Sequence, residues 1–168
     1  GRCWGFAGLN LMRLQVVDSL ELNTFEFSQN YFMFWDKLEK ANYFLENIIK
    51  SRDESYESRL ITHLLKAPVQ DGGQWDMFVN LINKYGAVPK DVMPETNHSS
   101  KSGAMNYILT HKLREFASIL RKKPAKNSSA LKKDMMETIY NLLAMFLGQP
   151  PDVINWSTRN KDNRHIVI

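Results

Sequence analysis

The chain has 168 residues, of which 43% are hydrophobic and 24% charged, and its formal net charge is +4. This balance is typical of a folded globular protein with one sizeable core, and it excludes an intrinsically disordered chain. The single cysteine excludes a scaffold of internal disulfides and favours a cytosolic or nuclear compartment, while the lack of a long apolar run predicts no membrane span. There is no signal-peptide pattern, and because the sequence does not begin with Met, we expect a piece of a longer product.

The first two predicted elements are helices with different surroundings. Over residues 3–17, apolar residues lie on most faces of the expected helix, which favours a position inside a domain. A second helix is expected over residues 28–49, with Ser28 as its N-cap. Its apolar stripe has helical spacing and comprises Tyr31, Trp35, Leu38, Ala41, Leu45 and Ile48. Asp36 and Lys40 are four residues apart and are predicted to pair on its solvent-exposed side.

Two shorter helices are expected next, separated by a tight turn. Residues 50–58 are charged and predict a surface loop. The third helix ends before Pro68 and carries Tyr56, Leu60, Ile61, Leu64 and Leu65. Asp71-Gly72-Gly73 is the strongest turn signal in the chain. The fourth helix is expected over residues 75–85, with Gly86 in the position typical of a C′ glycine.

The composition changes near residue 90, where Pro, Asn, Ser and Thr interrupt the helical pattern. We therefore predict two parts, residues 1–90 and residues 91–168. The second part is expected to contain amphipathic helices over residues 104–122 and 130–147. Its polar tail ends in residues 165–168, which predict an edge strand or a loop.

A basic block lies at residues 112–133 and contains one acidic residue, Glu115. Its basic residues are Lys112, Arg114, Arg121, Lys122, Lys123, Lys126, Lys132 and Lys133. Such a block can bind a phosphate backbone or an acidic protein surface. It is also typical of a solvated helix end and loop, so the sequence leaves both interpretations open.

The lone thiol stands in the motif Gly1-Arg2-Cys3-Trp4, where the first helix is expected to begin. A helix N-terminus stabilises a thiolate, which is the nucleophilic form of cysteine. The backbone N–H of Cys3 could also donate to the oxyanion of an attacked carbonyl, and Trp4 would shield the site from water. A buried, inert cysteine on a core helix fits these residues as well, so residue chemistry alone leaves the two alternatives open.

Further sequence blocks accompany the thiol motif. They are Phe25-Glu26-Phe27-Ser28-Gln29, Phe34-Trp35-Asp36-Lys37-Leu38-Glu39-Lys40, Asp71-Gly72-Gly73-Gln74-Trp75-Asp76-Met77, Lys84-Tyr85-Gly86-Ala87-Val88-Pro89-Lys90 and Leu147-Gly148-Gln149-Pro150-Pro151. In this order, the chain resembles the bleomycin hydrolase / aminopeptidase C branch of the papain-like cysteine peptidases, which has Arg where papain has Ser before the nucleophile. Because the blocks cover nearly the whole chain, we interpret Cys3 as a nucleophile.

The resemblance implies a fold and a set of roles. Cys3 would be the nucleophile and Trp4 its usual neighbour. Gly72 and Gly73 resemble the glycine pair whose backbone pairs with an extended peptide near the S2 position. The implied fold is mainly α: the helix-rich left subdomain of a papain-like fold in residues 1–90, plus a helical insertion in the second part, without the β-rich half.

The histidines offer no strong base for this nucleophile. In papain-like enzymes the histidine follows the cysteine by about 130–150 residues. Counted from Cys3, that window is residues 133–153 and holds no histidine, while His165 lies beyond it with no later Asn. The other histidines fall in helical patterns or a polar loop: His63, His98 and His111. With one cysteine and no histidine pair at helical spacing, no zinc site is expected. No phosphate-binding loop motif occurs either, so no cofactor is expected.

The implied activity is that of a cysteine aminopeptidase, which cleaves peptide or aminoacyl-amide bonds through a thioester acyl-enzyme. The oxyanion-hole Gln of the family would fall before Gly1, and its His and Asn after Ile168, so we expect an incomplete enzyme that is inactive alone. The resemblance also implies a cytoplasmic protein that forms a homo-oligomeric, hexameric ring when complete. The alternative function is a nucleic-acid or protein-binding module that uses residues 112–133.

Overall fold

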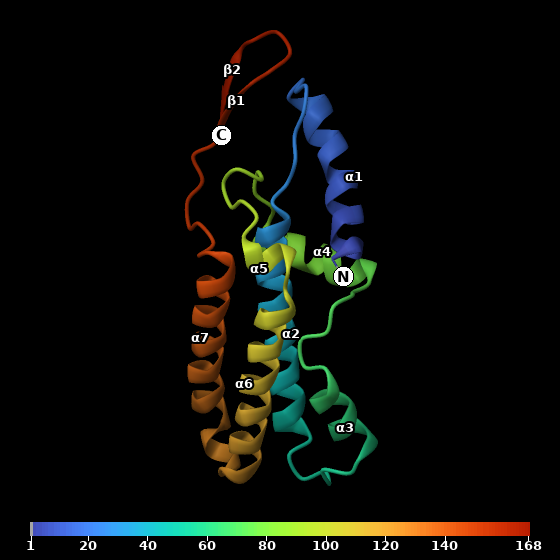
Figure 1. Cartoon of the computed structure of the whole chain (residues 1–168), viewed down its shortest axis with the longest axis vertical. Coiled ribbons are helices and arrows are strands. Elements are labelled where there is room, and N and C mark those ends of the chain that lie inside the picture. The colour runs from blue at the N-terminus through green and yellow to red at the C-terminus, as the bar shows by residue number, and fades with distance from the viewer. Residues whose placement is uncertain (1) are drawn as a thin grey trace.

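The computed structural model describes residues 2–168, so Gly1 of the thiol motif lies outside the described residues. These residues form an elongated, mainly helical molecule with a small two-stranded sheet at one end (Figure 1). The elements in chain order are α1 (Cys3–Ser19), α2 (Gln29–Lys50), α3 (Arg59–Lys66), α4 (Trp75–Tyr85), α5 (Asn97–Ser100), α6 (Gly103–Lys122), the 3-10 helix η1 (Ala125–Asn127), α7 (Ser128–Leu147), β1 (Ser157–Arg159) and β2 (His165–Val167).

Helix α2 is the centre of the molecule. Its predicted N-cap is confirmed, because the Ser28 hydroxyl accepts a hydrogen bond from the N–H of Tyr31 at 3.0 Å. Helices α6 and α7 pack along it, and all three contribute to one core that includes Phe34, Leu113 and Leu143 (Figure 1). Because apolar residues lie on several of its faces, α2 is buried on more sides than the predicted stripe indicated.

Helix α1, which carries Cys3, is less enclosed than expected. Its buried residues are Gly5, Gly8 and Leu9, whereas Leu11 and Leu14 are 59% and 57% exposed. Only α2 and α4 make substantial contacts with α1 among the described residues, which leaves part of its apolar surface open. The expectation of a helix enclosed within the domain is therefore wrong for the described residues.

Short elements account for the other differences from the predicted ones. Helix α5 lies in the stretch near residue 90 that was predicted to be irregular, and it begins with a capping box between Thr96 and Ser99. The predicted strand at the tail is confirmed as β2, and it pairs antiparallel with β1, which was not expected. Helix α3 begins after the Ser58 N-cap, as the predicted loop over residues 50–58 indicates, whereas Tyr56, which was expected on this helix, lies in the loop before it. Helix α4 and its terminal Gly86, which has a φ of 73°, agree with the prediction.

Candidate active site

The candidate nucleophile begins the helix that carries it. Cys3 is the first residue of α1 and its side chain is exposed. At this position the sulfur lies at the end of the helix where backbone N–H groups have no partner within the helix. Arg2 precedes it as N-cap, and no side chain caps this end of the helix by a hydrogen bond.

Arg2 fixes the start of α1 to the segment that follows α4. Its guanidinium donates to both carboxylate oxygens of Glu95, at 3.0 and 3.1 Å. Ser99 of α5 donates a further hydrogen bond to Glu95, at 2.5 Å. This bidentate geometry is the strong form of an arginine–carboxylate pair, and it orients Arg2, which directly precedes Cys3.

Trp4 lies between α2 and the glycine turn. Its ring meets Phe32 edge to face, with ring centroids 5.1 Å apart. A side chain at Gly73 would place its Cβ only 2.7 Å from the Trp4 ring, so this contact requires glycine. Gly72 has a φ of +108°, a backbone conformation that side-chain-bearing residues rarely adopt. Three of the sequence-predicted site residues, Trp4, Gly72 and Gly73, therefore lie in one cluster in the structure. The fourth, Cys3, directly precedes Trp4 in the sequence.

Two buried lysines of α2 hold the glycine turn. Lys37 is 1% exposed and donates to the Val69 carbonyl and to the Asp71 carboxylate, both at 2.7 Å. Lys40 is 8% exposed and donates to the Gly72 carbonyl at 2.7 Å. The turn is thus fixed to α2 through side-chain cations.

Lys40 also pairs with Asp36, at 2.8 Å, one turn earlier on α2. The predicted solvent-exposed position of this pair is wrong, because both residues are buried beneath the turn. The sequence reasoning missed this group, and also the role of Lys37. The usable signal was three charged residues, Asp36, Lys37 and Lys40, in a helix with apolar residues on several faces.

Burial disfavours the charged forms of the Asp36–Lys40 pair. It raises the pKa of Asp36 against the opposing effect of Lys40, and it lowers the pKa of Lys40 against the opposing effect of Asp36. At Asp71, by contrast, the hydrogen bond and charge of Lys37 outweigh burial, so the pKa of this carboxyl lies below its ordinary value.

A cavity of about 940 Å³ lies on one side of the glycine turn. Helices α2, α3 and α4 supply its walls, with Tyr43, Leu60 and Met77 among the apolar lining residues. The turn itself lines the cavity through residues 70–74, whereas neither Cys3 nor Trp4 lines it among the described residues.

The described residues place no base next to the thiol. Cys3 makes no hydrogen bond to any histidine within residues 2–168. His63 lines the cavity beyond the turn, His98 lies against Phe146, His111 lies on α6 and His165 begins β2. Within the same residues, no group of three or more His, Cys, Asp or Glu side chains could hold a metal ion.

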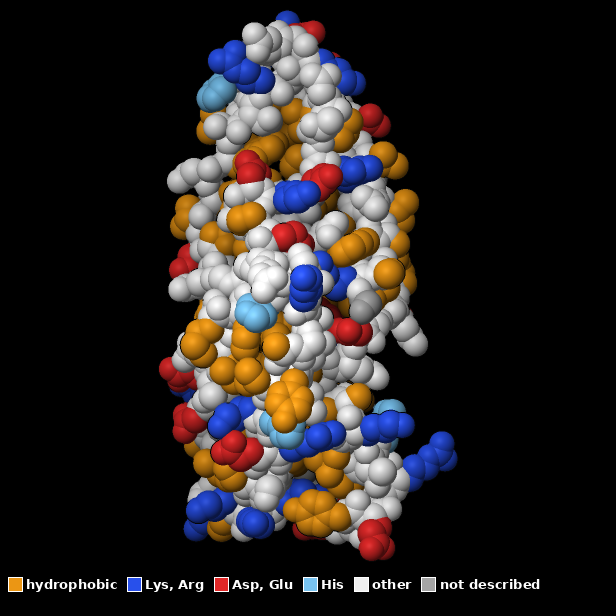
Figure 2. Space-filling view, viewed as in Figure 1, with side chains coloured by type: hydrophobic (Ala, Val, Ile, Leu, Met, Phe, Trp, Pro, Cys, Tyr) orange, Lys and Arg blue, Asp and Glu red, His pale blue; other side chains and the backbone are white. Residues whose placement is uncertain are grey.

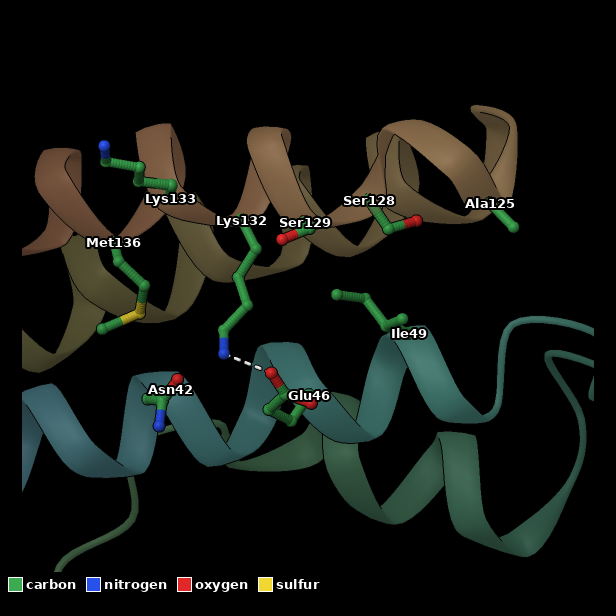
Figure 3. A pocket seen from close by; sticks show the side chains of 9 residues that line it. All are labelled: Asn42, Glu46, Ile49, Ala125, Ser128, Ser129, Lys132, Lys133 and Met136. Atoms are coloured by element: carbon green, nitrogen blue, oxygen red, sulfur yellow. Dashed lines mark hydrogen bonds and ion pairs between the residues drawn. The ribbon is translucent and has the colours of Figure 1, made fainter.

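The basic block is partly committed to internal contacts. Lys112 pairs with Glu115, and Arg114 donates to the carbonyls of Leu65 and Lys66. Lys132 of α7 pairs with Glu46 of α2 across a pocket of about 530 Å³ (Figure 3). Lys and Arg side chains at the lower end of the visible face alternate with acidic and hydrophobic ones (Figure 2).

The two arginines at the ends of α2 and α6 form what we call the arginine clasp, Arg52 and Arg121. Arg52 donates to the Leu120 carbonyl at 3.0 Å and also to the Lys123 carbonyl, at the end of α6. Arg121 donates to the Ser51 carbonyl at 3.0 Å and also to the Glu54 carbonyl, just after α2. Each arginine therefore binds carbonyl groups at the end of the other helix.

Comparison with known proteins shows the family. Residues 1–167 match the model of the Peptidase C1-like family, so the chain belongs to this family. It is 55% identical over 165 residues to Aminopeptidase C from Listeria innocua, which covers 97% of the chain and 37% of that protein. It is 43% identical over 172 residues to Bleomycin hydrolase from Oryctolagus cuniculus, covering 98% of the chain and 62% of that protein.

A solved structure gives the same result for the fold. The crystal structure of PepW from Lactobacillus rhamnosis HN001 covers the whole chain with a TM-score of 0.96 and 46% identity, over 39% of PepW. The predicted family resemblance and the mainly α, papain-like fold class are thus confirmed. The chain spans less than two thirds of the length of each of these relatives.

Proposed function

We propose that this chain supplies the nucleophile-bearing, helix-rich part of a cysteine aminopeptidase. Cys3 attacks the carbonyl carbon of a peptide or aminoacyl amide and forms a thioester as the C–N bond breaks. The leaving amine takes up a proton, and water then hydrolyses the thioester. Membership of the Peptidase C1-like family and the names of the relatives, which include aminopeptidases and a cysteine proteinase, support this proposal.

The single observation that carries the proposal is the contact between Trp4 and Gly73. It places the turn with the glycine pair against the residue that follows the thiol. A peptide whose backbone pairs with Gly72 and Gly73 would then lie along the start of α1, with a carbonyl near the exposed Cys3 sulfur. In this arrangement, the Trp4 ring lies between the glycine pair and the start of α1.

Turnover also requires a proton shuttle. A histidine usually accepts the thiol proton and returns a proton to the leaving amine. Because no histidine contacts Cys3 within residues 2–168, we expect the isolated chain to bind peptides without cleaving them at a measurable rate. Assembly into a homo-oligomeric ring, location in the cytoplasm and the division into residues 1–90 and 91–168 belong to the same proposal.

Labelling of the single thiol tests the proposal. We expect a peptidyl epoxide to alkylate Cys3 at least about tenfold faster than a matched epoxide without the peptide, because binding at the glycine pair raises the local concentration of the reagent. Gly73→Ala should remove this preference through its clash with Trp4, while Cys3→Ser should abolish labelling. Equal rates for the two epoxides on the unmodified chain would contradict the proposed substrate site.

Sedimentation and cell fractionation test the remaining parts. A single homogeneous monomer of the complete protein would contradict the ring. The yeast relative is named as a mitochondrial cysteine proteinase, so fractionation must separate cytosol from mitochondria. Recovery of the protein with mitochondria would contradict the cytoplasmic assignment.

A further inference from the structure

We propose that Lys40 is a positioning residue for the glycine pair, an inference that rests on the proposed function of that pair. Its ammonium group donates to the Gly72 carbonyl at 2.7 Å and lies 5.3 Å from the centre of the Trp4 ring. The Asp36 carboxylate, at 2.8 Å, holds the same ammonium group from below. One buried cation therefore joins the residue after the nucleophile to the backbone that binds substrate.

The surroundings of the turn explain why such a tether is required. On one side, Gly73 touches the Trp4 ring, which limits movement toward α1. On the other side lies the cavity of about 940 Å³, which residues 70–74 line directly. Within residues 2–168, the turn therefore faces open space on this side, and the hydrogen bonds from Lys37 and Lys40 of α2 help to hold it.

Lys37 does not duplicate this function. It binds the Val69 carbonyl and the Asp71 carboxylate, which precede the glycine pair. Lys40 binds Gly72 itself and is also the lysine that lies over the Trp4 ring. Lys40 therefore makes a contact with the glycine pair itself and with Trp4 that Lys37 does not make.

The hydrogen bond from Lys40 also makes the Gly72 peptide group more rigid than it would be without this bond. The Gly72 carbonyl points its oxygen at Lys40, so the neighbouring peptide groups have a fixed orientation. Pre-organisation of this kind lowers the ordering cost when a ligand binds. Loss of the tether should therefore weaken peptide capture and leave the intrinsic reactivity of the thiol unchanged.

Two measurements on the 168-residue chain test this inference. The first is the rate of cleavage within residues 70–74 by a low concentration of a broad-specificity serine protease, which reports local opening of the turn. The second is the rate ratio of Cys3 alkylation by a peptidyl epoxide and by iodoacetamide, which is specific because the chain has one cysteine. For Lys40→Met, we expect cleavage within residues 70–74 to be at least about tenfold faster and the alkylation rate ratio to be about tenfold lower, because the Gly72 carbonyl loses its hydrogen bond from a charged group.

Matched variants separate positioning from general damage. Lys84→Met removes a lysine that lines the same cavity but binds Glu39, and it should change neither measurement. Lys40→Arg keeps a cation at the site, so both measurements should stay close to those of the unmodified chain. The double variant Asp36→Leu/Lys40→Met removes both charges of the pair, so it replaces Lys40→Met in both measurements if Lys40→Met does not fold.

The outcomes distinguish this inference from the proposed function. An unchanged rate of cleavage within residues 70–74 of folded Lys40→Met, or of the folded double variant, would overturn the positioning role. If cleavage becomes faster while the unmodified chain shows no preference for the peptidyl reagent, Lys40 positions the turn and the proposed peptide site is wrong.

Discussion

At the scale of single residues, the Asp36–Lys40 pair combines strong contacts with costly burial. Burial shifts both pKa values toward the neutral forms, and the Asp36 Oδ1 atom has no hydrogen-bond partner among the described residues. Breaking a buried pair leaves an uncompensated charge, whereas replacing both partners by apolar residues removes the desolvation cost. The pair therefore serves the geometry of the turn more than the stability of the fold.

This interpretation predicts a non-additive mutant cycle. Lys40→Met should lower the free energy of unfolding by about 3–5 kcal/mol, because Asp36 is left buried and alone. The double variant Asp36→Leu/Lys40→Met should be more stable than Lys40→Met by at least about 1 kcal/mol. Urea denaturation measures both values, and strictly additive losses would contradict the prediction.

Glu39 should make the stability of the fold depend on pH in the acidic range. Burial raises the pKa of this carboxyl, but hydrogen bonds from Lys84 and Tyr85 outweigh it, so the pKa lies below its ordinary value of 4.5. A carboxyl with a lowered folded-state pKa stabilises the fold above pH 4.5, and this stabilisation is lost as the pH falls through the lowered value.

We therefore expect Glu39→Gln to be less stable than the unmodified chain at neutral pH, with a difference that shrinks as the pH falls below 4.5. Urea denaturation across this range measures the difference. Glu137→Gln, at an exposed position with no ion pair among the described residues, is the control and should show no such trend. A pH-independent difference for Glu39→Gln would contradict the explanation by the lowered pKa of Glu39.

At the scale of elements, the arginine clasp fixes the ends of α2 and α6 to each other. Its guanidinium groups donate to the Leu120 carbonyl in the last turn of α6 and to the Ser51 carbonyl just after α2, which also accepts a hydrogen bond from the N–H of Glu54. Arg121 also lies 4.3 Å over the ring of Tyr56, which orders the loop between α2 and α3. Half of the eight basic residues of the block therefore act within the chain; the others are Lys122, Lys123, Lys126 and Lys133, which make no ion pair within residues 2–168.

Removing either arginine of the clasp should cost stability. We expect Arg52→Met and Arg121→Met each to lower the free energy of unfolding by about 1–2 kcal/mol, since each loses hydrogen bonds from a charged donor. Lysine should restore little at either site, because it lacks the planar fork that reaches two carbonyls. The control Lys122→Met should lie within about 0.5 kcal/mol of the unmodified chain, and equal losses for all three methionine variants would refute the clasp.

The sequence predicted the long elements well because their signals are local. Ser28 and Gly86 marked helix ends correctly, since capping depends on residues close in the chain. Helix α5 was missed because four residues carry no periodicity, and β1 because its pairing with β2 is a tertiary contact. Of the candidate site, Cys3, Trp4, Gly72 and Gly73 came from motifs. The hydrogen bonds from Lys37 and Lys40 did not, because charged residues in a largely apolar helix suggest burial, but the turn that they bind is a tertiary contact.

At the scale of the whole molecule, one core joins the two predicted parts of the chain. Residues of α2 pack with residues of α6 and α7 in the same cluster, and Ser28 donates to the Met93 carbonyl across the predicted boundary. The division near residue 90 stays a prediction about the course of the chain. The packing indicates that both parts unfold together.

This leads to a prediction about cooperativity. Leu143 of α7 is fully buried, so Leu143→Ala should lower the free energy of unfolding by about 2–5 kcal/mol. The loss should be equal by tryptophan fluorescence, which reports mainly on residues 4–75, and by far-ultraviolet circular dichroism. Met145→Ala, two residues away and 73% exposed, should change little. Two separate transitions would contradict a shared core.

The clasp has a further consequence for how the overall charge of the chain is understood. Helices α2 and α6 run in the same direction, so their C-terminal ends, which both carry partial negative charge, lie next to each other (Figure 1). The partial charges of two adjacent C-terminal ends repel each other, and the two guanidinium groups lie where they offset this repulsion. Part of the positive excess of the chain thus compensates for the parallel arrangement of these two helices.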